Sequence, residues 1–374
     1  SLKPSTLIKF LFCSISLFLF ISNCRAQCED VTLASITNPG PYSVSFLVEG
    51  VDDIRNGPDY EGATIYYPNN GVPAYAGISI IPGYCGVESD IQNWGPFYAS
   101  HGIIAITLGT NDPCADWPAA RAVALLDAIE TIKSENTRAG SPLNGKVDVN
   151  SFAVSGWSMG GGGAQLAASI DPSLKAVVGL CPWLDLNGFE NSDLIHDVPV
   201  LIFTGQNDDI AGSAQYGYMH YTNTPNSTDK LFFEIENGGH GAANEPNMAD
   251  GETGIYALSW LKTYLLDDPC YCDFLLQNPS NSSAYETNIE CESLELLLPS
   301  YQEMLVLHPN PANGSISLNL TKAELLSYQL YDVFGKCVKS GNVSKQQNKI
   351  EIEGLQNGAY TLRVGDRNYR FVKK

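Results

Sequence analysis

Apolar and polar positions alternate in blocks over the first two thirds of the chain, from about Ala63 to Leu266. Short apolar or β-branched runs predict strands, and longer segments with helical periodicity predict helices between them. The predicted strands are 63–67, 76–83, 102–109, 152–156, 174–180, 198–205 and 231–238, and the predicted helices are 119–135, 162–172 and 251–268. This alternation predicts an α/β fold with a mostly parallel central sheet covered on both faces. Ligands of such sheets bind at the carboxyl ends of the strands.

The pattern changes after Cys291. Residues 302–374 contain short runs that alternate apolar and polar positions, separated by turn signals, as in HPNPANGSISLNL and NGAYTLRVG. Such runs are typical of a small antiparallel β-sandwich. We therefore predict an α/β domain over 27–292, a linker over 293–301 and an all-β domain over 302–374.

The first 26 residues have the pattern of a secretory signal peptide. Lys3 and Lys9 provide the positive start, an apolar run follows, and Ala26 is a small residue at the expected cleavage point. A transmembrane anchor is the alternative, but the apolar run is short for a span of roughly 20 residues. Attachment of a lipid through Cys24 fits less well, because Ile21-Ser22-Asn23 poorly matches the residues that precede a lipid-attached cysteine. The sequence thus predicts a secreted protein.

Charge is unevenly distributed along the chain, whose net charge is −20. Residues 27–300 contain 8 Lys and Arg against 35 Asp and Glu, whereas residues 301–374 contain 10 against 6. An acidic body repels phosphate backbones and anionic lipid headgroups. These counts exclude nucleic acid and an anionic membrane surface as partners and suit an extracellular protein that acts on neutral material.

Cysteine usage agrees with export into an oxidising compartment, where several cysteines can pair. Cys270 and Cys272 form a CxC pattern, which we expect to contribute to two disulfides rather than to a metal site. Cys181, in an apolar run, is expected to be a small buried hydrophobic residue. We predict no metal site and no cofactor.

The stretch FAVSGWSMGGGGAQLAAS, residues 152–169, contains the clearest chemical signal. Gly156-Trp157-Ser158-Met159-Gly160 matches GxSxG at the end of a predicted strand and the start of a predicted helix. Each helical glycine costs about 1 kcal/mol relative to alanine, so the four glycines need a reason. A nucleophile on a sharp strand-to-helix turn gives one, because strand and helix must approach closely around it. An ordinary glycine loop would not explain this setting, and we predict that Ser158 is a nucleophile.

A nucleophilic serine needs a base and an orienting carboxylate. Among the five histidines, His240 lies in a glycine-rich loop directly after a predicted strand, where it can reach a site at the strand ends. The others are interpreted as structural or surface residues, and they are His101, His196, His220 and His308. The carboxylate should fall between serine and histidine. Asp208 and Asp209 both lie at the end of the strand 198–205, and the residues alone do not separate them.

From about Tyr60 to Cys291 the chain resembles the bacterial cutinase and poly(ethylene terephthalate) hydrolase family of α/β-hydrolases. The resemblance rests on IIPGYCG, WGPFYASHGIIAITLGTND, GKVDVNSFAVSGWSMGGGG, DPSLKAVVGLCPW, LIFTGQNDDIA and GGHGAAN. It implies an α/β-hydrolase fold with Asp208, from a D-x-I-A pattern, as the carboxylate. It also implies oxyanion-binding amides at Tyr84 and Met159. The substrate-binding residues that it implies are Tyr84, Trp157, Met159, Trp183 and Ile210. For Trp183, plain core packing is the alternative.

The chain also departs from this family. Some relatives bridge a cysteine before the catalytic aspartate to one after the histidine, and here those positions are Gly205 and Ala242. We hypothesise a different bridge near the cleft, between Cys85 and Cys114. A bridge from Cys270 or Cys272 to Cys291 would loosely resemble the family's C-terminal disulfide.

The tail resembles the C-terminal sorting domain of the Bacteroidetes type IX secretion pathway. The matching features are HPNPANG, YDVFGK and GLQNGAYTLRV. The resemblance implies that the type IX secretion machinery is a partner and that the protein is exported, with possible outcomes of tail removal or surface attachment. A carbohydrate-binding or adhesive sandwich is the alternative.

Together these features predict a secreted, monomeric serine carboxylic-ester hydrolase that acts on polyesters, both cutin-like and aromatic. A lipase or small-ester esterase of the same fold is one alternative. A dienelactone hydrolase fits less well, because that family's nucleophile is cysteine. A non-catalytic surface-binding protein is the alternative from a different class.

Overall fold

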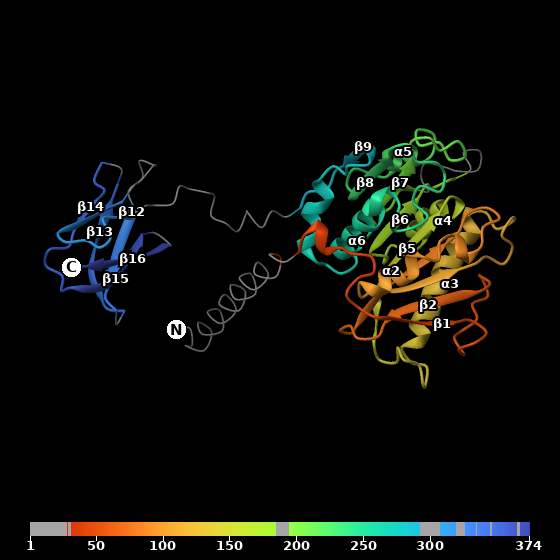
Figure 1. Ribbon diagram of the computed structural model, residues 1–374, viewed down its shortest axis with the longest axis horizontal. Coiled ribbons are helices and arrows are strands. Elements are labelled where there is room, and N and C mark those ends of the chain that lie inside the picture. Colours follow the sequence, from red (N-terminus) through yellow and green to blue (C-terminus); the bar gives the residue numbers. More distant parts are fainter. Residues whose placement is uncertain are drawn as a thin grey trace, which may run out of the picture. The chain divides into compact units, whose positions relative to one another are not determined.

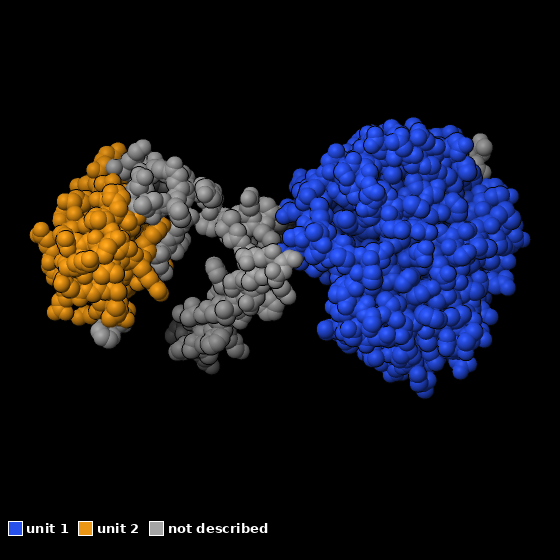
Figure 2. All heavy atoms as spheres, viewed as in Figure 1, with its two compact units in different colours: residues 1–292 blue, residues 293–374 orange. Residues whose placement is uncertain are grey.

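The computed structural model describes Cys28 and residues 31–184, 194–291, 307–318, 326–333, 335–344, 346–364 and 367–374. Two compact units divide the chain, residues 1–292 and residues 293–374 (Figure 2). The predicted signal peptide and the predicted linker 293–301 lie outside the described residues. Within the described residues, no helix is both long and apolar enough to span a membrane.

A nine-stranded sheet is the centre of the first unit, with the strand order β1-β2-β4-β3-β5-β6-β7-β8-β9 (Figure 1). The strands are β1 Val44–Val48, β2 Ala63–Pro68, β3 Tyr75–Ile81, β4 Ile104–Leu108, β5 Val147–Trp157, β6 Ala176–Leu180, β7 Val200–Gly205, β8 Lys230–Ile235 and β9 Ser282–Thr287. The strands from β4 to β8 in this order pair in parallel, and β1, β2 and β9 pair antiparallel at the two edges. The predicted mostly parallel sheet is confirmed.

Helices cover both faces of this sheet, as Figure 1 shows. They are α2 Trp94–Ser100, α3 Pro118–Glu135, α4 Met159–Ile170, α5 Gly217–Asn223 and α6 Glu252–Tyr264. Trp94 of α2 and Trp260 of α6 are fully buried in one apolar core, whereas Leu125 of α3 and Ala164 of α4 belong to the core on the other face. All seven residues of β3 are buried, which explains why the central strands are continuous apolar runs.

The first unit also contains the short 3-10 helices η1 Leu33–Ser35, η2 Glu88–Asp90, η4 Ala249–Gly251 and η5 Pro269–Leu276. Three disulfides connect the described residues of this unit. Cys28 pairs with Cys270, and Cys272 pairs with Cys291, so the CxC pattern does contribute to two disulfides. Cys85 pairs with Cys114, as hypothesised. Cys181 is buried and unpaired, in agreement with its expected role as a small hydrophobic residue.

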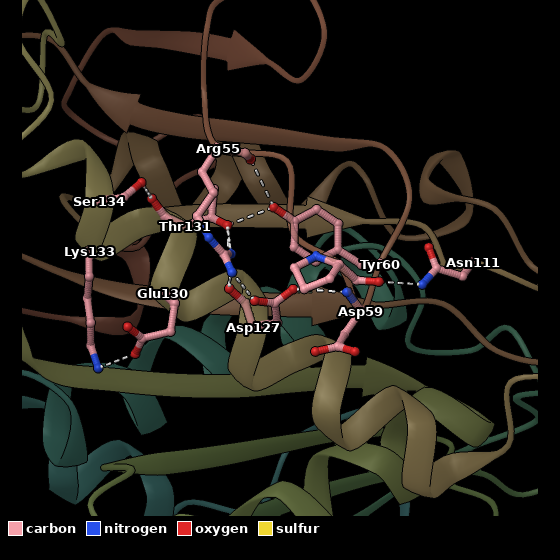
Figure 3. A network of polar contacts seen from close by, with 10 residues as sticks. Arg55, Asp59, Tyr60, Asn111, Asp127, Glu130, Thr131, Lys133 and Ser134 are labelled. Atoms are coloured by element: carbon pink, nitrogen blue, oxygen red, sulfur yellow. Dashed lines mark hydrogen bonds and ion pairs between the residues drawn. The ribbon is translucent and has the colours of Figure 1, made fainter.

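A polar network attaches the segment before β2 to α3 (Figure 3). The Arg55 guanidinium forms an ion pair with Asp127 and donates to Thr131 Oγ1 at 2.8 Å. The Tyr60 hydroxyl lies 2.7 Å from the same Thr131 oxygen. Asn111 Nδ2 donates to the carbonyl oxygen of Pro58 at 2.9 Å, which connects this segment to the loop between β4 and α3.

The second unit is all-β and antiparallel. One sheet has the order β10-β11-β14 and the other β13-β12-β15-β16. The strands are β10 Leu307–His308, β11 Ser315–Leu318, β12 Leu326–Tyr331, β13 Cys337–Val343, β14 Lys349–Glu351, β15 Gly358–Val364 and β16 Arg367–Lys373. Both sheets contribute to one apolar core, for example through Ile316, Leu330 and Phe371. The predicted C-terminal all-β region is confirmed.

Candidate active site

Ser158 lies at the turn between β5 and α4, at the carboxyl edge of the parallel sheet. Its backbone has φ 56° and ψ −119°, a left-handed conformation that is rare for a residue with a side chain. The neighbouring glycines explain how the turn packs. A Cβ on Gly156 would lie 2.2 Å from the Gly160 carbonyl oxygen, and one on Gly160 would lie 2.4 Å from the Ile81 carbonyl oxygen. Side chains at these positions would therefore push strand and helix apart.

Two loops from the same edge of the sheet bring an imidazole and a carboxylate to this serine. His240 follows β8, and its Nε2 lies 2.9 Å from Ser158 Oγ. Its Nδ1 lies 2.8 Å from Asp208 Oδ2, and Asp208 follows β7. The Trp157 indole donates to the His240 carbonyl oxygen at 2.8 Å, which fixes the backbone beneath the ring. Serine, imidazole and carboxylate thus form one hydrogen-bonded chain.

The structure also separates the two aspartates that the sequence left open. Asp208 is buried, and its Oδ1 accepts hydrogen bonds from the amides of Ile210 at 2.9 Å and Ala211 at 2.8 Å. Burial raises the pKa of Asp208, but the hydrogen bonds from His240 and from these amides outweigh burial, so its pKa lies below the usual value. Asp209 is exposed. The carboxylate that contacts His240 is therefore Asp208, and it is ionised at neutral pH.

Hydrogen bonds and close backbone packing join the Asp208 loop to the His240 loop. The Asn207 amide donates to the Gly238 carbonyl oxygen at 2.7 Å, and the Asn237 amide donates to Gln206 Oε1 at 2.9 Å. A Cβ on Gly205 would lie only 2.4 Å from the Gly239 carbonyl oxygen. The glycine at this position therefore lets the two loops approach closely.

The turn Pro82-Gly83-Tyr84 lies on the other side of the serine. A Cβ on Gly83 would lie 2.7 Å from the Ser158 Cβ, so this turn directly contacts the serine. Met159 is the first residue of α4, and amides in the first turn of a helix have no acceptor within the helix. In the described part of the chain, neither the Tyr84 amide nor the Met159 amide donates to a backbone carbonyl. Both amides therefore remain able to bind an anionic oxygen.

Arg121 contacts this turn through a hydrogen bond, and this contact was not predicted from the sequence. Its side chain is fully buried, and it donates to the carbonyl oxygens of Pro82 at 3.0 Å and Pro113 at 2.8 Å. Burial lowers the pKa of Arg121 to about 10, with partial compensation from Asp116. The guanidinium thus joins the turn before Tyr84 to the loop between β4 and α3. The Cys85–Cys114 disulfide connects the same two segments.

Aromatic and apolar side chains surround the serine. The Trp183 amide donates to the Ser158 carbonyl oxygen at 2.8 Å, and its ring is partly exposed, so the ring is not a plain core residue. Trp157 lies with its ring centroid 5.2 Å from that of His240. Tyr84 and Ile210 are 57% and 62% exposed, whereas Met159 is buried. The structure thus places the predicted substrate-binding residues on the segments around Ser158.

The other histidines lie in different environments. His101 Nε2 lies 2.8 Å from the Thr37 carbonyl oxygen, and His196 Nε2 lies 2.8 Å from Gln165 Oε1. Burial lowers the pKa of both imidazoles to about 4 and that of His220 to about 3. His308 belongs to the second unit. Within the described ranges, no group of three or more His, Cys, Asp and Glu side chains is arranged to bind a metal ion.

Comparison with known proteins places most of the chain in one family. Residues 22–292 match the family model described as PET hydrolase-like. The chain belongs to the PET hydrolase-like family. This assignment confirms the predicted family and fold class, since an α/β sheet with its serine at the strand-to-helix turn is what the structure shows.

Similar members of this family include a cutinase of Thermobifida alba, 37% identical over 243 residues, which cover 64% of this chain and 76% of the cutinase. Cutinase 1 of Thermobifida cellulosilytica is 37% identical over 64% of this chain and 86% of its own length. A bis(hydroxyethyl) terephthalate hydrolase of Streptomyces coelicolor is 34% identical over 66% of this chain and 75% of its own length. These relatives are carboxylic ester hydrolases, so the predicted enzyme class of this PET hydrolase-like protein is confirmed.

Residues 306–374 match the secretion system C-terminal sorting domain. A PET hydrolase-like domain followed by this sorting domain is located outside the cell or on its surface, as the sequence predicted. The adhesive alternative for the tail receives no support from this match.

Proposed function

We propose that this PET hydrolase-like protein is a secreted serine esterase that cleaves polyesters through Ser158, His240 and Asp208. The observation that carries the proposal is the hydrogen-bonded chain from Asp208 Oδ2 through both nitrogens of His240 to Ser158 Oγ, with lengths of 2.8 and 2.9 Å. Both distances are those of hydrogen bonds along which a proton can be transferred.

In the acylation step, Ser158 Oγ attacks the ester carbonyl carbon while His240 Nε2 accepts the serine proton. Asp208 accepts from His240 Nδ1, which fixes the tautomer and stabilises the imidazolium. The depressed pKa of Asp208 keeps its carboxylate charged during this step. His240 then donates the proton to the departing alcohol, and a water molecule cleaves the acyl-enzyme by the same route.

The negative charge that develops on the carbonyl oxygen needs hydrogen-bond donors in place before the reaction. We assign this role to the amides of Tyr84 and Met159, one from each segment that contacts Ser158. Preorganised donors of this kind are each worth about 3 kcal/mol of transition-state stabilisation. No cofactor takes part in this scheme.

The residues around the serine favour a polymeric, neutral and apolar substrate. Tyr84 and Ile210 expose most of their side chains, and the strongly acidic domain disfavours anionic substrates. A polyester segment fits such an open apolar surface, and the similar proteins are named for cutin and terephthalate esters. A lipase or small-ester esterase remains the second candidate, and activity ratios on tributyrin, polycaprolactone and PET film distinguish the two.

The remaining domain assignments belong to the same proposal. Residues 1–26 act as a signal peptide, residues 27–292 form a monomeric catalytic domain, and 293–301 link it to the sorting domain 302–374. The type IX secretion machinery recognises that domain. Deletion of 302–374 should abolish release of the protein and leave ester hydrolysis intact.

The decisive experiment compares the wild type with Ser158→Ala on p-nitrophenyl esters of increasing chain length and with a fluorophosphonate probe. We expect the substitution to lower kcat by about 10⁴-fold or more and to abolish labelling. Ser173→Ala, at an exposed serine after α4, is the matched control and should behave as the wild type. A wild-type protein that the probe does not label would exclude this function in favour of a surface-binding protein.

A further inference from the structure

Trp117 is a large apolar side chain that lies beside the site and has no part in the chemistry above. It immediately precedes α3, at the end of the loop after β4, and is 50% exposed. A single exposed apolar residue is common on protein surfaces, but a contiguous exposed apolar surface marks a binding region. Trp117 therefore indicates a binding region only if other partly exposed apolar side chains lie against it.

Its neighbours show that it is not isolated. The Trp117 ring centroid lies 5.8 Å from that of Trp183, and Trp183 lies 5.9 Å from Tyr216. These three rings come from the loop before α3, the segment after β6 and the segment before α5. Because the Trp183 amide donates to the Ser158 carbonyl oxygen, the central residue of these three lies next to the serine. We call Trp117, Trp183 and Tyr216 the aromatic row.

The backbone at Trp117 is anchored at several points. The Trp117 carbonyl oxygen accepts from the Arg121 amide at 3.1 Å, and Pro118 restricts the chain directly after it. Cys114, three residues earlier, is bonded to Cys85, and the Cys85 amide donates to the Pro113 carbonyl oxygen at 2.7 Å. A ring on such a backbone loses little conformational freedom when a ligand binds.

Charge near Trp117 limits the kind of ligand. Asp112 and Asp116 lie on the same loop, within five residues of the indole. Carboxylates at this position repel a ligand that carries its own carboxylate, whereas an uncharged diester meets no such repulsion. Aromatic ligand rings gain most from the row, because offset and edge-to-face ring pairs add to plain apolar burial.

We propose that the aromatic row binds an uncharged, ring-containing segment of the polyester next to the ester that Ser158 cleaves, and that Trp117 determines the preference for such segments. This inference rests on the proposed function. It extends the substrate-binding residues implied by the family resemblance, among which Trp117 is absent.

The test measures kcat and KM of the full-length protein on two soluble substrates. One is a two-ring ethylene terephthalate dimer with uncharged hydroxyethyl ends, and the other is ethyl acetate, which contains no aromatic ring. We expect Trp117→Ala to lower kcat/KM on the dimer about 3- to 10-fold more than on the acetate, mainly through KM. Trp117→Phe, which retains a ring, should recover most of the loss.

Phe46→Ala is the matched control, because Phe46 on the edge strand β1 is also an exposed aromatic residue, at 59%. It should leave both substrates within about 2-fold of wild type. Equal changes on dimer and acetate in Trp117→Ala, or an unchanged dimer KM, would overturn the role of Trp117. Failure of the proposed function appears differently, as Ser158→Ala that still hydrolyses both substrates.

Discussion

The two sides of Ser158 are built with different chemistry. On the side of the proposed oxyanion-binding amides, called the oxyanion side, a disulfide and the buried Arg121 guanidinium join the Pro82–Tyr84 turn to the loop before α3. On the acid–base side, hydrogen bonds such as that from the Asn207 amide to the Gly238 carbonyl oxygen join the two loops. The same task, keeping two loops at fixed separation, is thus performed by a covalent bond on one side and by backbone contact on the other.

The difference follows from the space between the loops. At Gly205 a Cβ would already lie 2.4 Å from the Gly239 carbonyl oxygen, so the loops are too close for bulky side chains. On the other side, the cysteine side chains and the guanidinium fill the space between the segments. Direct packing therefore holds these two loops together, and the hydrogen bonds among Ser158, His240 and Asp208 form without a disulfide between positions 205 and 242.

The largest effect should come from breaking the acid–base side at its carboxylate. Asp208→Asn removes the charge that stabilises the imidazolium and permits the wrong tautomer, so we expect kcat on a p-nitrophenyl ester to fall about 10⁴-fold. Asp209→Asn is the matched control and should keep nearly full activity. If the two variants lost activity equally, the assignment of Asp208 would be wrong.

On the oxyanion side, removal of the disulfide should cost stability. Cys85 and Cys114 are 29 residues apart in sequence, and a loop of that size corresponds to about 3.6 kcal/mol of unfolding free energy. We expect the double substitution Cys85→Ser/Cys114→Ser to lower the free energy of unfolding by about that amount in denaturant titrations. Cys337→Ser, at an exposed free cysteine of the second unit, should change nothing. Coincident unfolding curves for the double variant and wild type would show that the disulfide does not stabilise this side.

Arg121→Met should separate positioning from stability. The substitution removes the guanidinium donor from the Pro82 carbonyl oxygen and leaves the Pro113 carbonyl oxygen with only the Cys85 amide, which displaces the turn that carries the Tyr84 amide. We expect kcat to fall about 10- to 100-fold with little change in KM, and Arg121→Lys to recover part of the loss.

Arg55→Met is the control for this variant, since Arg55 also binds α3, but through Asp127 and Thr131 and not through the turn before Tyr84 (Figure 3). It should lower the unfolding midpoint and leave kcat within about 2-fold of wild type. An unchanged kcat in Arg121→Met would contradict a positioning role for the guanidinium.

The smallest effect concerns pH. The pKa of Asp208 is lowered in the folded protein, so its stabilisation is complete above the unfolded value of 3.8 and is lost as the pH falls through the lower folded pKa. The pKa of Arg121 is about 10, so its charge is constant throughout this range. Thermal unfolding below pH 4 should depend less on pH in Asp208→Asn than in wild type, while Arg121→Met keeps the wild-type slope. Parallel curves for all three proteins would refute this difference between the sides.

The buried histidines lower the stability of all three proteins alike as the pH falls. Burial lowers the pKa of His101 and His196 to about 4, so the unfolded chain binds protons more readily and stability falls as the pH drops from 6.5 towards 4. This loss of stability is the same in the wild type, Asp208→Asn and Arg121→Met, so it does not contribute to the difference expected among them below pH 4.

The parallel strands could be predicted because burial on both faces makes them continuous apolar runs. The edge strands β1 and β9 were not predicted, since most of their residues are only partly buried and their composition resembles that of loops. The helices α2 and α5 also escaped prediction, because seven residues that include Gly, Pro or Asn give little helical periodicity. Their positions depend on packing against the sheet.

In the site, the GxSxG pattern between a predicted strand and a predicted helix was enough to indicate Ser158, although the contacts that require its glycines come from other segments, such as the Ile81 carbonyl oxygen at Gly160. Asp208 could not be separated from Asp209 by the residues alone, since the choice depends on the loop conformation that directs two amides at one oxygen. Arg121 and Trp117 were missed because each acts through contacts between distant segments. A tryptophan followed by proline, in the loop after a strand and before a helix, is the signal that would have indicated Trp117.

The disulfide between Cys272 and Cys291 has a mechanical consequence for a chain that carries a sorting domain. Strand β9 lies within the 19-residue span that this bond closes. The covalent path from residue 291 back to η5 therefore runs through this disulfide and bypasses β9, and Cys270 joins the same 3-10 helix to Cys28. Tension on the chain beyond residue 291 reaches η5 through the disulfide before it loads the hydrogen bonds between β9 and β8, which protects the edge of the sheet next to the His240 loop.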